Sequence, residues 1–556
     1  MSLLTTASLV VTPNAGEEGT LFSIVPDTGL GDLSVTRATT ATRVNSAGLV
    51  ELVPYNSVPF SQEFNNGVWS YYLSTITPNS TIAPDGTTSA DTIAISGTNG
   101  STYQSTSLGE GTYTISAYFK KINEDNVYMD CGIGGYFGAS FNLTTEVITP
   151  FGGAFNFNME DVGNGWFRCS VQGYANGSGG YGFGVYASGG QSAYIWGAQL
   201  NEGTIKPYQK TETRLNIPRL DYSNGTCPSL LVEPQRTNLL WYSEQFDNAT
   251  YWSPFNATIT GNTAISPSGT NTADTLTSNA VTGGDVYRLI TLNGTYTTSA
   301  FFKSGNASIA RIAYSNGNTA NFNLSNGTYT ISGGTSASIE DAGNGWWRCT
   351  FTTTITSGAL VAYGVDGASG NFVYLWGAQL EVGTYATSYI PTTSASVTRN
   401  ADVISKTGIS SLIGQTEGTL FVDVYRPTSN SPFIFMIANS VGANAYLNSI
   451  YLYQLPTAQL TCDVFVSGVL QASIVTSLSG LAVGRNKIAI AYKQNDFALY
   501  INGTQIGTDT SGNVPTMSAF EINGADISSI SNVETNAAAL WKTRLTNTQL
   551  AQLTTI

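Results

Sequence analysis

Tryptophan rings, arginines and carboxylates recur at matched positions in two parts of this chain. The segment Gly163–Ser170 reads Gly-Asn-Gly-Trp-Phe-Arg-Cys-Ser, and it returns 180 positions later as Gly343–Thr350. Tyr194–Asn201 returns at the same offset as Tyr374–Glu381. An indole ring can stack on the C–H face of a sugar while its N–H finds a partner. These positions are therefore candidates for carbohydrate recognition.

The same rings also have a structural interpretation, because a tryptophan that recurs at one position in two copies of a sandwich is typically a core residue. We favour the core for Trp166, Trp196, Trp346 and Trp376. Trp69 and Trp252 follow a Ser-x-x-Phe-x-Asn segment and are expected at a module edge. Trp347 stands where the first copy has Phe167. The candidate glycan-binding residues are therefore Trp69, Trp252 and Trp347.

Two acidic pairs, Glu160-Asp161 and Glu340-Asp341, precede the tryptophan motifs. Their oxygens would suit Ca²⁺, or one carboxylate would serve as half of an acid–base pair. Glycoside hydrolysis needs two carboxylates that face each other across a sugar, whereas adjacent strand residues point to opposite faces. The following Gly-Asn-Gly favours a turn in which the aspartate accepts local N–H groups. We predict turn structure here and no metal site.

Catalytic chemistry is disfavoured by composition. The chain contains no histidine, which removes the commonest general base and the commonest metal ligand. No Gly-x₄-Gly-Lys-Ser/Thr phosphate loop is present. The five cysteines lie far apart, so we expect neither a zinc site nor a disulfide framework, and we expect Cys169 and Cys349 to be buried. The prediction is a protein that is not an enzyme and has no cofactor.

Charge and hydropathy restrict the partners. The 556 residues carry a formal net charge of −14, which disfavours nucleic acid and an anionic membrane surface. No apolar run is long enough to predict membrane insertion, and no signal peptide is expected. Only 10% of residues are charged, while 41% are hydrophobic and 11% aromatic, so the chain is not disordered. We expect a soluble protein made in a reducing cytoplasm, with the surface of an exterior protein.

Strand periodicity dominates the modules that hold these motifs. Thr112–Lys120, for example, places Tyr113, Ile115, Ala117 and Phe119 on one face. Many short alternating runs between Gly, Asn and Ser clusters predict an all-β fold of tandem jelly-roll or β-sandwich modules. The segment 546–554 is the one predicted helical turn, with Thr546 as its N-cap.

Four domains are expected from the repeat boundaries. We expect the first jelly-roll module, 59–210, to be inserted into a small N-terminal element, which leaves a split base or attachment domain made of 1–58 plus 211–238. The second module spans 239–400, and 401–556 forms a further sandwich with a different sequence. Such insertions succeed where the two ends lie close together at the surface.

Several of these elements resemble fibre, spike and appendage proteins of tailed bacteriophages. Ala41–Glu51, Pro218–Tyr222 and Leu231–Leu240 are similar to the head-fibre or spike-associated element of that group, and the two modules are similar to its carbohydrate-binding jelly rolls. The C-terminal segment, with Phe497–Gly503, is similar to concanavalin-like or laminin-G-like sandwiches. The resemblance implies a head or tail fibre or spike that contacts host cell-surface polysaccharide. The alternative is a structural decoration or appendage protein without glycan binding.

Arginines concentrate in the split base domain, at Arg37, Arg43, Arg219 and Arg236. Their forked donors suit ion pairs at interfaces, so we predict that they attach the chain to other virion proteins of the capsid or tail. Pairing with Asp221 or Glu233 is the alternative. A homo-oligomer, with a trimer favoured, would multiply weak glycan contacts. The predicted location is the virion, assembled in the host cytoplasm.

Overall fold

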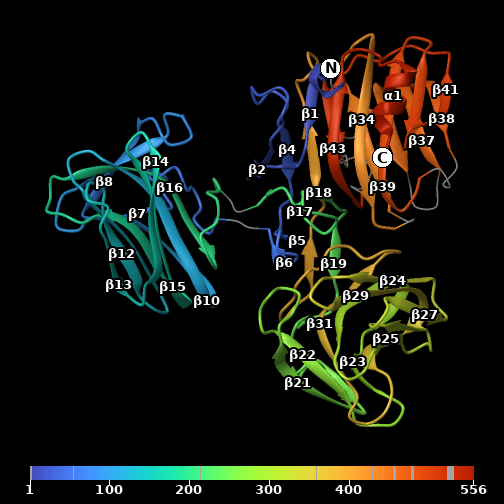
Figure 1. Ribbon diagram of the computed structural model, residues 1–556, viewed down its shortest axis with the longest axis horizontal. Coiled ribbons are helices and arrows are strands. Elements are labelled where there is room, and N and C mark those ends of the chain that lie inside the picture. Colours follow the sequence, from blue (N-terminus) through green and yellow to red (C-terminus); the bar gives the residue numbers. More distant parts are fainter. Residues whose placement is uncertain are drawn as a thin grey trace. The chain divides into compact units, whose positions relative to one another are not determined.

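The computed structural model describes residues 3–53, 56–212, 215–358, 360–428, 431–442, 444–454, 459–476, 481–522 and 531–556. The chain is all-β, as predicted. Its described helices are short: η1 (Leu3–Thr6), η2 (Ala445–Leu447) and α1 (Asn547–Thr554). Two compact units are present (Figure 1): Pro54–Ile217, and Met1–Val53 together with Pro218–Ile556. No helix in the described part is long and apolar enough to cross a membrane.

The smaller unit holds the first module, a sandwich built on two long strands. β7 and β11 pair with one half of β10 and β15, and β16 and β14 pair with the other half. The sheet folds over at this change of partners, and it encloses one apolar core. Its strands are β7 (Ser70–Tyr72), β8 (Ser74–Thr81), β9 (Ala90–Ile95), β10 (Ser101–Lys121), β11 (Asn126–Ile133), β12 (Phe137–Asn142), β13 (Ile148–Gly152), β14 (Phe155–Gly163), β15 (Trp166–Val185) and β16 (Ser192–Glu202).

The second module repeats this plan with separate sheets. One six-stranded sheet has the order β20-β23-β30-β25-β26-β27, and the other has the order β21-β22-β31-β24-β29-β28. Their strands are β20 (Ser253–Phe255), β21 (Ala257–Ala264), β22 (Ala273–Ser278), β23 (Gly284–Arg288), β24 (Leu292–Ser304), β25 (Ile309–Tyr314), β26 (Thr319–Asn323), β27 (Thr328–Ser332), β28 (Ser336–Asp341), β29 (Trp346–Gly358), β30 (Val361–Val365) and β31 (Phe372–Val382).

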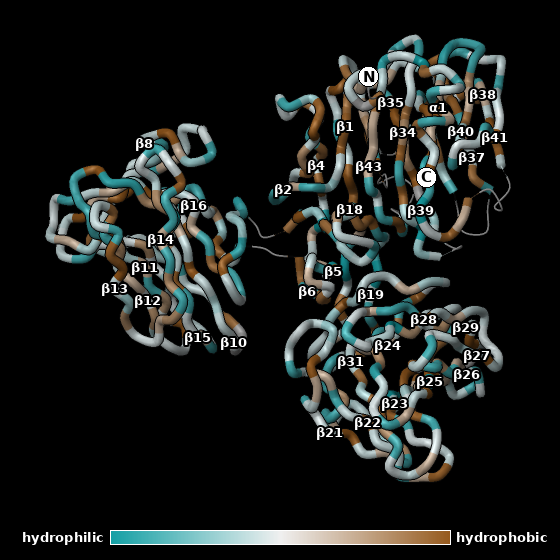
Figure 2. The backbone as a smooth tube through the Cα atoms, in the orientation of Figure 1, coloured by the Kyte–Doolittle hydropathy of each residue, from teal (hydrophilic) through white to brown (hydrophobic). Residues whose placement is uncertain are grey.

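A third sandwich occupies the C-terminal part of the chain. Hydrophobic residues lie along strands β34 and β43 (Figure 2). Its later strands are β33 (Val403–Lys406), β34 (Glu417–Arg426), β35 (Phe433–Ala438), β36 (Ser449–Gln454), β37 (Leu460–Val466), β38 (Val469–Val475), β39 (Gly484–Lys493), β40 (Phe497–Ile501), β41 (Thr504–Asp509), β42 (Ala519–Ile522) and β43 (Val533–Trp541). α1 closes this part with Thr546 as its N-cap, in a capping box with Gln549.

Most of the expected split base does not stand as a domain of its own. β1 (Leu9–Val11) and β18 (Ser229–Val232) both pair with β43, and β4 (Leu33–Thr36) pairs with β33. The remaining strands of this region are β2 (Gly16–Glu17), β3 (Thr20–Leu21), β5 (Thr42–Val44), β6 (Val50–Leu52), β17 (Leu220–Asp221), β19 (Arg236–Asn238) and β32 (Val397–Arg399).

The physical reason is burial of apolar side chains from the N-terminal strands. Leu9, Val11 and Leu33 lie in the same core as Phe435 and Leu540 of the C-terminal sandwich. Strands of three or four residues have too little apolar surface to form a core of their own. They are stable here because each extends a sheet that already exists.

The duplication extends to single hydrogen bonds. The Asn56 side-chain amide donates to the carbonyl of Ala198 at 2.7 Å, and the Asn238 amide donates to the carbonyl of Ala378 at 3.0 Å. Both asparagines thereby fasten the entry of a module to the strand that carries its Trp-Gly-Ala-Gln-Leu motif. Cys169 and Cys349 are buried and free, as predicted.

Candidate functional site

Trp69 and Trp252 are core residues in the two modules. Trp69 is 3% exposed and Trp252 is 1% exposed, so no ring face is open to a sugar. Their indole N–H groups donate to the carbonyls of Phe60 (3.1 Å) and Tyr242 (3.0 Å). The prediction that these two rings bind glycan is therefore wrong in this structure. Local spacing was misleading because each ring bonds to a carbonyl of the segment that precedes it and packs into the module core.

Trp347 is half-buried and packs against the core of the second module. Its ring packs directly on Gly327: a Cβ atom added to this glycine would lie only 2.8 Å from the Trp347 ring. A sugar contact at its exposed part stays a prediction. Trp241, which the sequence interpretation did not single out, is more open: it is 41% exposed and stacks on Tyr251 with ring centroids 5.6 Å apart.

The other four repeated tryptophans are buried, as the structural interpretation predicted. In the first module Trp166 and Trp196 form a small cluster with Ala83 and Ala90. In the second module Trp346 and Trp376 cluster with Phe301, Tyr389 and Ala273. Both clusters lie outside the main core of their module. They give each module a second, smaller apolar layer.

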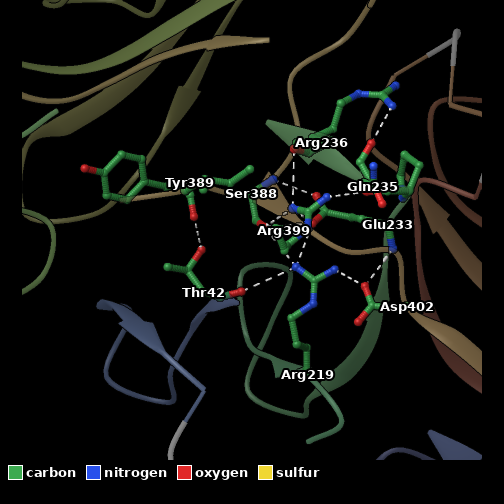
Figure 3. A network of polar contacts seen from close by, with 12 residues as sticks. Thr42, Arg219, Glu233, Gln235, Arg236, Ser388, Tyr389, Arg399 and Asp402 are labelled. Carbon is green, nitrogen blue, oxygen red and sulfur yellow. Dashed lines mark hydrogen bonds and ion pairs between the residues drawn. The ribbon is translucent and has the colours of Figure 1, made fainter. Parts of the chain in front are cut away.

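Arg37 and Arg219 lie inside the larger unit rather than on its surface. They are 1% and 0% exposed, and both bind Asp402. Arg219 also donates to Glu233 at 2.6 Å, and Arg399 donates to the same carboxylate oxygen of Glu233 at 2.6 Å. Figure 3 shows the Arg219 guanidinium between Glu233 and Asp402. The prediction that Arg37 and Arg219 attach to a neighbouring virion protein is therefore wrong.

The charges of this network stabilise one another. Burial alone would raise the pKa of Glu233, but Arg399 and Arg219 lower it. Burial would likewise raise the pKa of Asp402, but Arg219 and Arg37 lower it below its ordinary value. Both carboxylates are thus ionised at neutral pH, and the stability that they contribute is lost only as the pH falls through their lowered folded pKa values. The pairing of Arg219 with Glu233 is the alternative that the sequence left open, whereas Asp402 lies too far along the chain for spacing to indicate it.

Arg43 and Arg236 are half-buried and already have partners in the chain. Arg43 binds Glu51 at 2.9 Å and donates to the carbonyl of Leu220 at 2.9 Å. The guanidinium of Arg236 lies 5.1 Å from the ring centroid of Tyr385. Attachment of another protein through these two arginines stays a prediction.

The acidic pairs lie near the ends of strands β14 and β28, so the predicted turn follows them and does not include them. Asp161 accepts a hydrogen bond from the backbone N–H of Gly163, and Asp341 accepts one from Gly343, both at 2.8 Å. In the neighbouring positions, Glu160 lies opposite Arg168 and Glu340 lies opposite Arg348 across the strand pair. Within the described residues, no group of three His, Cys, Asp or Glu side chains is placed to hold a metal ion.

A cavity of about 910 Å³ lies in the larger unit, against the outer face of β28 and β29. Residues of the second module, the β5–β6 hairpin, the β17–β18 segment and the C-terminal sandwich contribute to its wall. Its polar lining includes Tyr222, Ser338, Glu340, Arg348, Thr350 and Glu534. Ligand pockets in proteins commonly have volumes of about 300–1,000 Å³. The cavity is therefore the candidate functional site of the larger unit.

The polar groups on the module side of the cavity are held in place. Arg348 donates to the hydroxyl of Ser299 at 3.3 Å and to the carbonyl of Thr387, and its guanidinium lies 5.6 Å from the Phe301 ring centroid. The hydroxyls of Ser338 and Thr350 share a hydrogen bond of 2.7 Å. A hydroxyl pair, a fixed guanidinium and the exposed carboxylate of Glu340 supply donors and acceptors suited to a polyol. Sequence reasoning missed the cavity because its walls come from distant segments.

Glu534 forms a buried part of the cavity wall. It accepts hydrogen bonds from Asn224 at 2.6 Å and Ser223 at 3.2 Å, and it also accepts one from Ser229. Burial, followed by the nearby charge of Asp221, raises the pKa of Glu534 from 4.5 to about 7. The folded protein therefore binds this proton more tightly than the unfolded chain does.

We expect Glu534→Gln to weaken the pH dependence of stability. A carboxyl whose folded pKa is raised stabilises the fold in its protonated form, so its contribution falls as the pH rises from about 4.5 to about 7. Urea unfolding at pH 5 and pH 8 measures this difference, which should be smaller in the variant. The exposed Glu202→Gln of the first module is the control and should behave as the wild type. An unchanged difference in Glu534→Gln would contradict the assignment.

No protein-family model matches the chain, and no curated protein matches it. Among solved structures, the carbohydrate-binding module CBM40 of the Ruminococcus gnavus IT-sialidase is similar at 12% identity, covering 25% of this chain and 84% of its own, with a TM-score of 0.22. The CBM22-1–CBM22-2 tandem of Paenibacillus barcinonensis Xyn10C is 9% identical, covers 63% of this chain and all of its own, and has a TM-score of 0.19. Domains LG4-5 of the mouse laminin α1 chain are 11% identical, cover 45% and 81%, and have a TM-score of 0.18. Scores this low carry no argument about function.

Proposed function

We propose that the chain is a structural component of a tailed-phage virion, a head or tail fibre or spike, that contacts host cell-surface glycans. The main support for glycan binding is the cavity of about 910 Å³ on the outer face of β28 and β29. Its hydroxyls, its carboxylates and the fixed guanidinium groups of Arg43 and Arg348 match the alternating donors and acceptors of a saccharide. Its size suits a short oligosaccharide or the end of a longer chain.

Contacts among three distant segments support the virion part of the proposal. The segments that resemble the phage element are Ala41–Glu51, Pro218–Tyr222 and Leu231–Leu240. Arg43 donates to the carbonyl of Leu220, 177 positions away, and Arg219 binds Glu233. The three segments that resemble the phage element therefore contact one another in the folded chain. We further propose a homo-oligomer, most simply a trimer, because multivalency strengthens weak glycan contacts.

A purely structural virion protein is the second candidate function. The burial of the six tryptophans Trp69, Trp166, Trp196, Trp252, Trp346 and Trp376 favours it, since these rings serve the fold and not a ligand. The buried ion network favours it as well, because it fixes the second module to the C-terminal sandwich. Glycan binding is the property that separates the two candidates.

The purified full chain is expected to bind a subset of a microarray of bacterial surface oligosaccharides. Ser338→Phe should weaken that binding by more than about tenfold, because a phenyl ring takes the space of a sugar ring in the cavity. Glu340→Gln should weaken it without changing the volume. The control is Asn158→Phe, at the matched position of the first module, which should bind as the wild type does.

Two results would overturn the proposal. Equal binding by Ser338→Phe and the wild type would remove the cavity as the site, and no binding to any glycan would leave the purely structural candidate. Immunogold electron microscopy with an antibody against the chain tests the virion role on purified phage particles. Unlabelled particles from a phage that encodes the chain would contradict it.

A further inference from the structure

One outer face of the first module is covered by aromatic side chains. It belongs to the part of the sheet in which β7, β10, β15, β11, β12 and β13 lie in this order. Across one row of this face, Tyr72, Ser101, Gly184 and Tyr128 are paired in register. Across the next row, Tyr103, Gly182 and Asp130 are paired, and Gly138 and Phe151 continue it. We refer to this face as the tyrosine platform.

Glycines form the floor of the tyrosine platform. A side-chain carbon at Gly184 would lie 2.5 Å from a ring carbon of Tyr128, and one at Gly138 would lie 2.3 Å from a ring carbon of Phe151. The two rings therefore lie across the glycines of the neighbouring strands. The hydroxyl of Tyr128 donates to the carbonyl of Asn99 at 3.0 Å and fixes its ring. The platform is thus preorganised, which lowers the entropic cost of binding a ligand.

The outer rings of the platform are open to solvent. Tyr72 is 56% exposed, Tyr136 is 55% exposed and Tyr186 is 52% exposed. Tyr136 stacks on Phe151 with centroids 5.7 Å apart, and Tyr186 meets Tyr128 edge-on at 6.1 Å. A contiguous exposed aromatic surface of this kind typically marks a binding site. Such rings can stack on the C–H faces of successive sugars.

The polar groups of the platform restrict the ligand. Asp130 lies at its centre, and burial raises the pKa of its carboxyl while a hydrogen bond from Tyr136 opposes this shift. The strand segments of this face, 70–72, 101–108, 126–133, 137–142, 148–152 and 177–185, contain no lysine or arginine. A carboxylate without a cation repels anionic ligands and accepts hydroxyl hydrogen bonds. The outward residues in these two rows are aromatic, glycine, serine, threonine or aspartate, so small polar groups that can bond sugar hydroxyls lie between the rings.

We propose that the tyrosine platform binds a neutral polysaccharide chain of pyranose units. This site goes beyond the proposed function, because it lies in the smaller unit and uses none of the residues that line the cavity of the larger unit.

The second module supplies an internal comparison. At the rows that match Tyr103–Gly182–Asp130, it has Asp285, Gly364 and Arg311 in register. Arg311 binds Asp285 at 2.8 Å, so an ion pair occupies the place of the central carboxylate and its neighbouring ring. Thr330 ends this row where the first module has Phe151. The platform is therefore a property of the first copy and not a requirement of the fold.

Affinity electrophoresis of the full chain tests the site directly. Gels contain dextran, galactomannan or xyloglucan as neutral polymers, or alginate as an anionic one. We expect at least one neutral polymer to retard the wild type and alginate to leave it unretarded. Tyr72→Ala with Tyr136→Ala should reduce the affinity by about tenfold or more, since each loses a stacking contact. Tyr446→Ala, an exposed tyrosine of the C-terminal sandwich, is the matched control and should not change it.

The outcomes separate this site from the cavity. Retardation by neutral polymer that persists in Ser338→Phe but is lost in the double tyrosine variant supports the platform, whatever the cavity does. No retardation in any neutral polymer, or equal retardation of the double variant, overturns the proposal. A change of oligomeric state in the double variant, measured by light scattering, would also overturn it and would identify the platform as a protein interface. Circular dichroism checks that both variants fold.

Discussion

Replacement of Asp402 by alanine is expected to destabilise the larger unit by about 3–5 kcal/mol. The change leaves the guanidinium groups of Arg37 and Arg219 buried without this carboxylate. It also removes the acceptor of the Glu233 backbone N–H, which now donates to Asp402 at 3.0 Å. A buried charge that loses its partner keeps its full desolvation cost, which is why the expected effect is large. Urea unfolding at pH 7 measures it.

The control for this experiment is Glu51→Ala. It removes the ion pair with Arg43, whose guanidinium keeps its hydrogen bond to the Leu220 carbonyl and remains partly exposed. A clearly smaller loss than that of Asp402→Ala is expected, because one partly exposed charge and not two fully buried ones loses its carboxylate. If Asp402→Ala and Glu51→Ala lowered the free energy of unfolding equally, the network would not fasten the unit in the way that its geometry indicates.

Trp252→Ala is expected to destabilise the second module by about 3–5 kcal/mol, the usual cost of removing a large buried aromatic side chain. Its ring packs against Phe246 at 5.0 Å and Tyr251 at 5.3 Å between centroids, and its N–H donates to the carbonyl of Tyr242. The substitution would leave a cavity, and the Tyr242 carbonyl would keep only its hydrogen bond from the Gln245 backbone N–H. The binding of glycan per folded molecule should stay the same.

The matched control is Trp241→Ala, because Trp241 is exposed and stacks on Tyr251 from the solvent side. It should cost much less stability than Trp252→Ala. Thermal unfolding followed by tryptophan fluorescence gives the comparison. A small loss for Trp252→Ala together with a loss of glycan binding would return Trp252 to the list of candidate ligand residues.

The two copies of the module share their frame and differ in their surfaces. Asn56 and Asn238 make equivalent amide hydrogen bonds, and Asp91 and Asp274 each accept two backbone N–H groups at equivalent positions. On the outer face, by contrast, the first copy has the tyrosine platform and the second has the Arg311–Asp285 pair. The residues whose hydrogen bonds hold each module together are the same in both copies. Exposed strand positions differ between the copies, because substitutions there affect packing little.

Much of the architecture follows from local sequence. Alternation of apolar and polar residues predicts strands because side chains point to opposite faces, and the structure confirms the all-β fold. Thr546 predicts a helix start as its N-cap, and α1 begins there. The repeat predicts two similar modules and the burial of Cys169 and Cys349. Each of these features depends on neighbours within a few residues or on a comparison of the chain with itself.

Long-range contacts were decided only by the tertiary structure. Whether Trp69 and Trp252 face solvent or core depends on which segment closes over them, and local spacing does not contain that information. Arg219, which directly precedes β17, meets Asp402, 183 positions away, only because β17 and β18 join the C-terminal sandwich through β43. The platform likewise needs the register of six strands to bring its rings together. The sequence alone therefore determined the elements and their repetition, whereas the fold determined which side chains are buried, paired or open to a ligand.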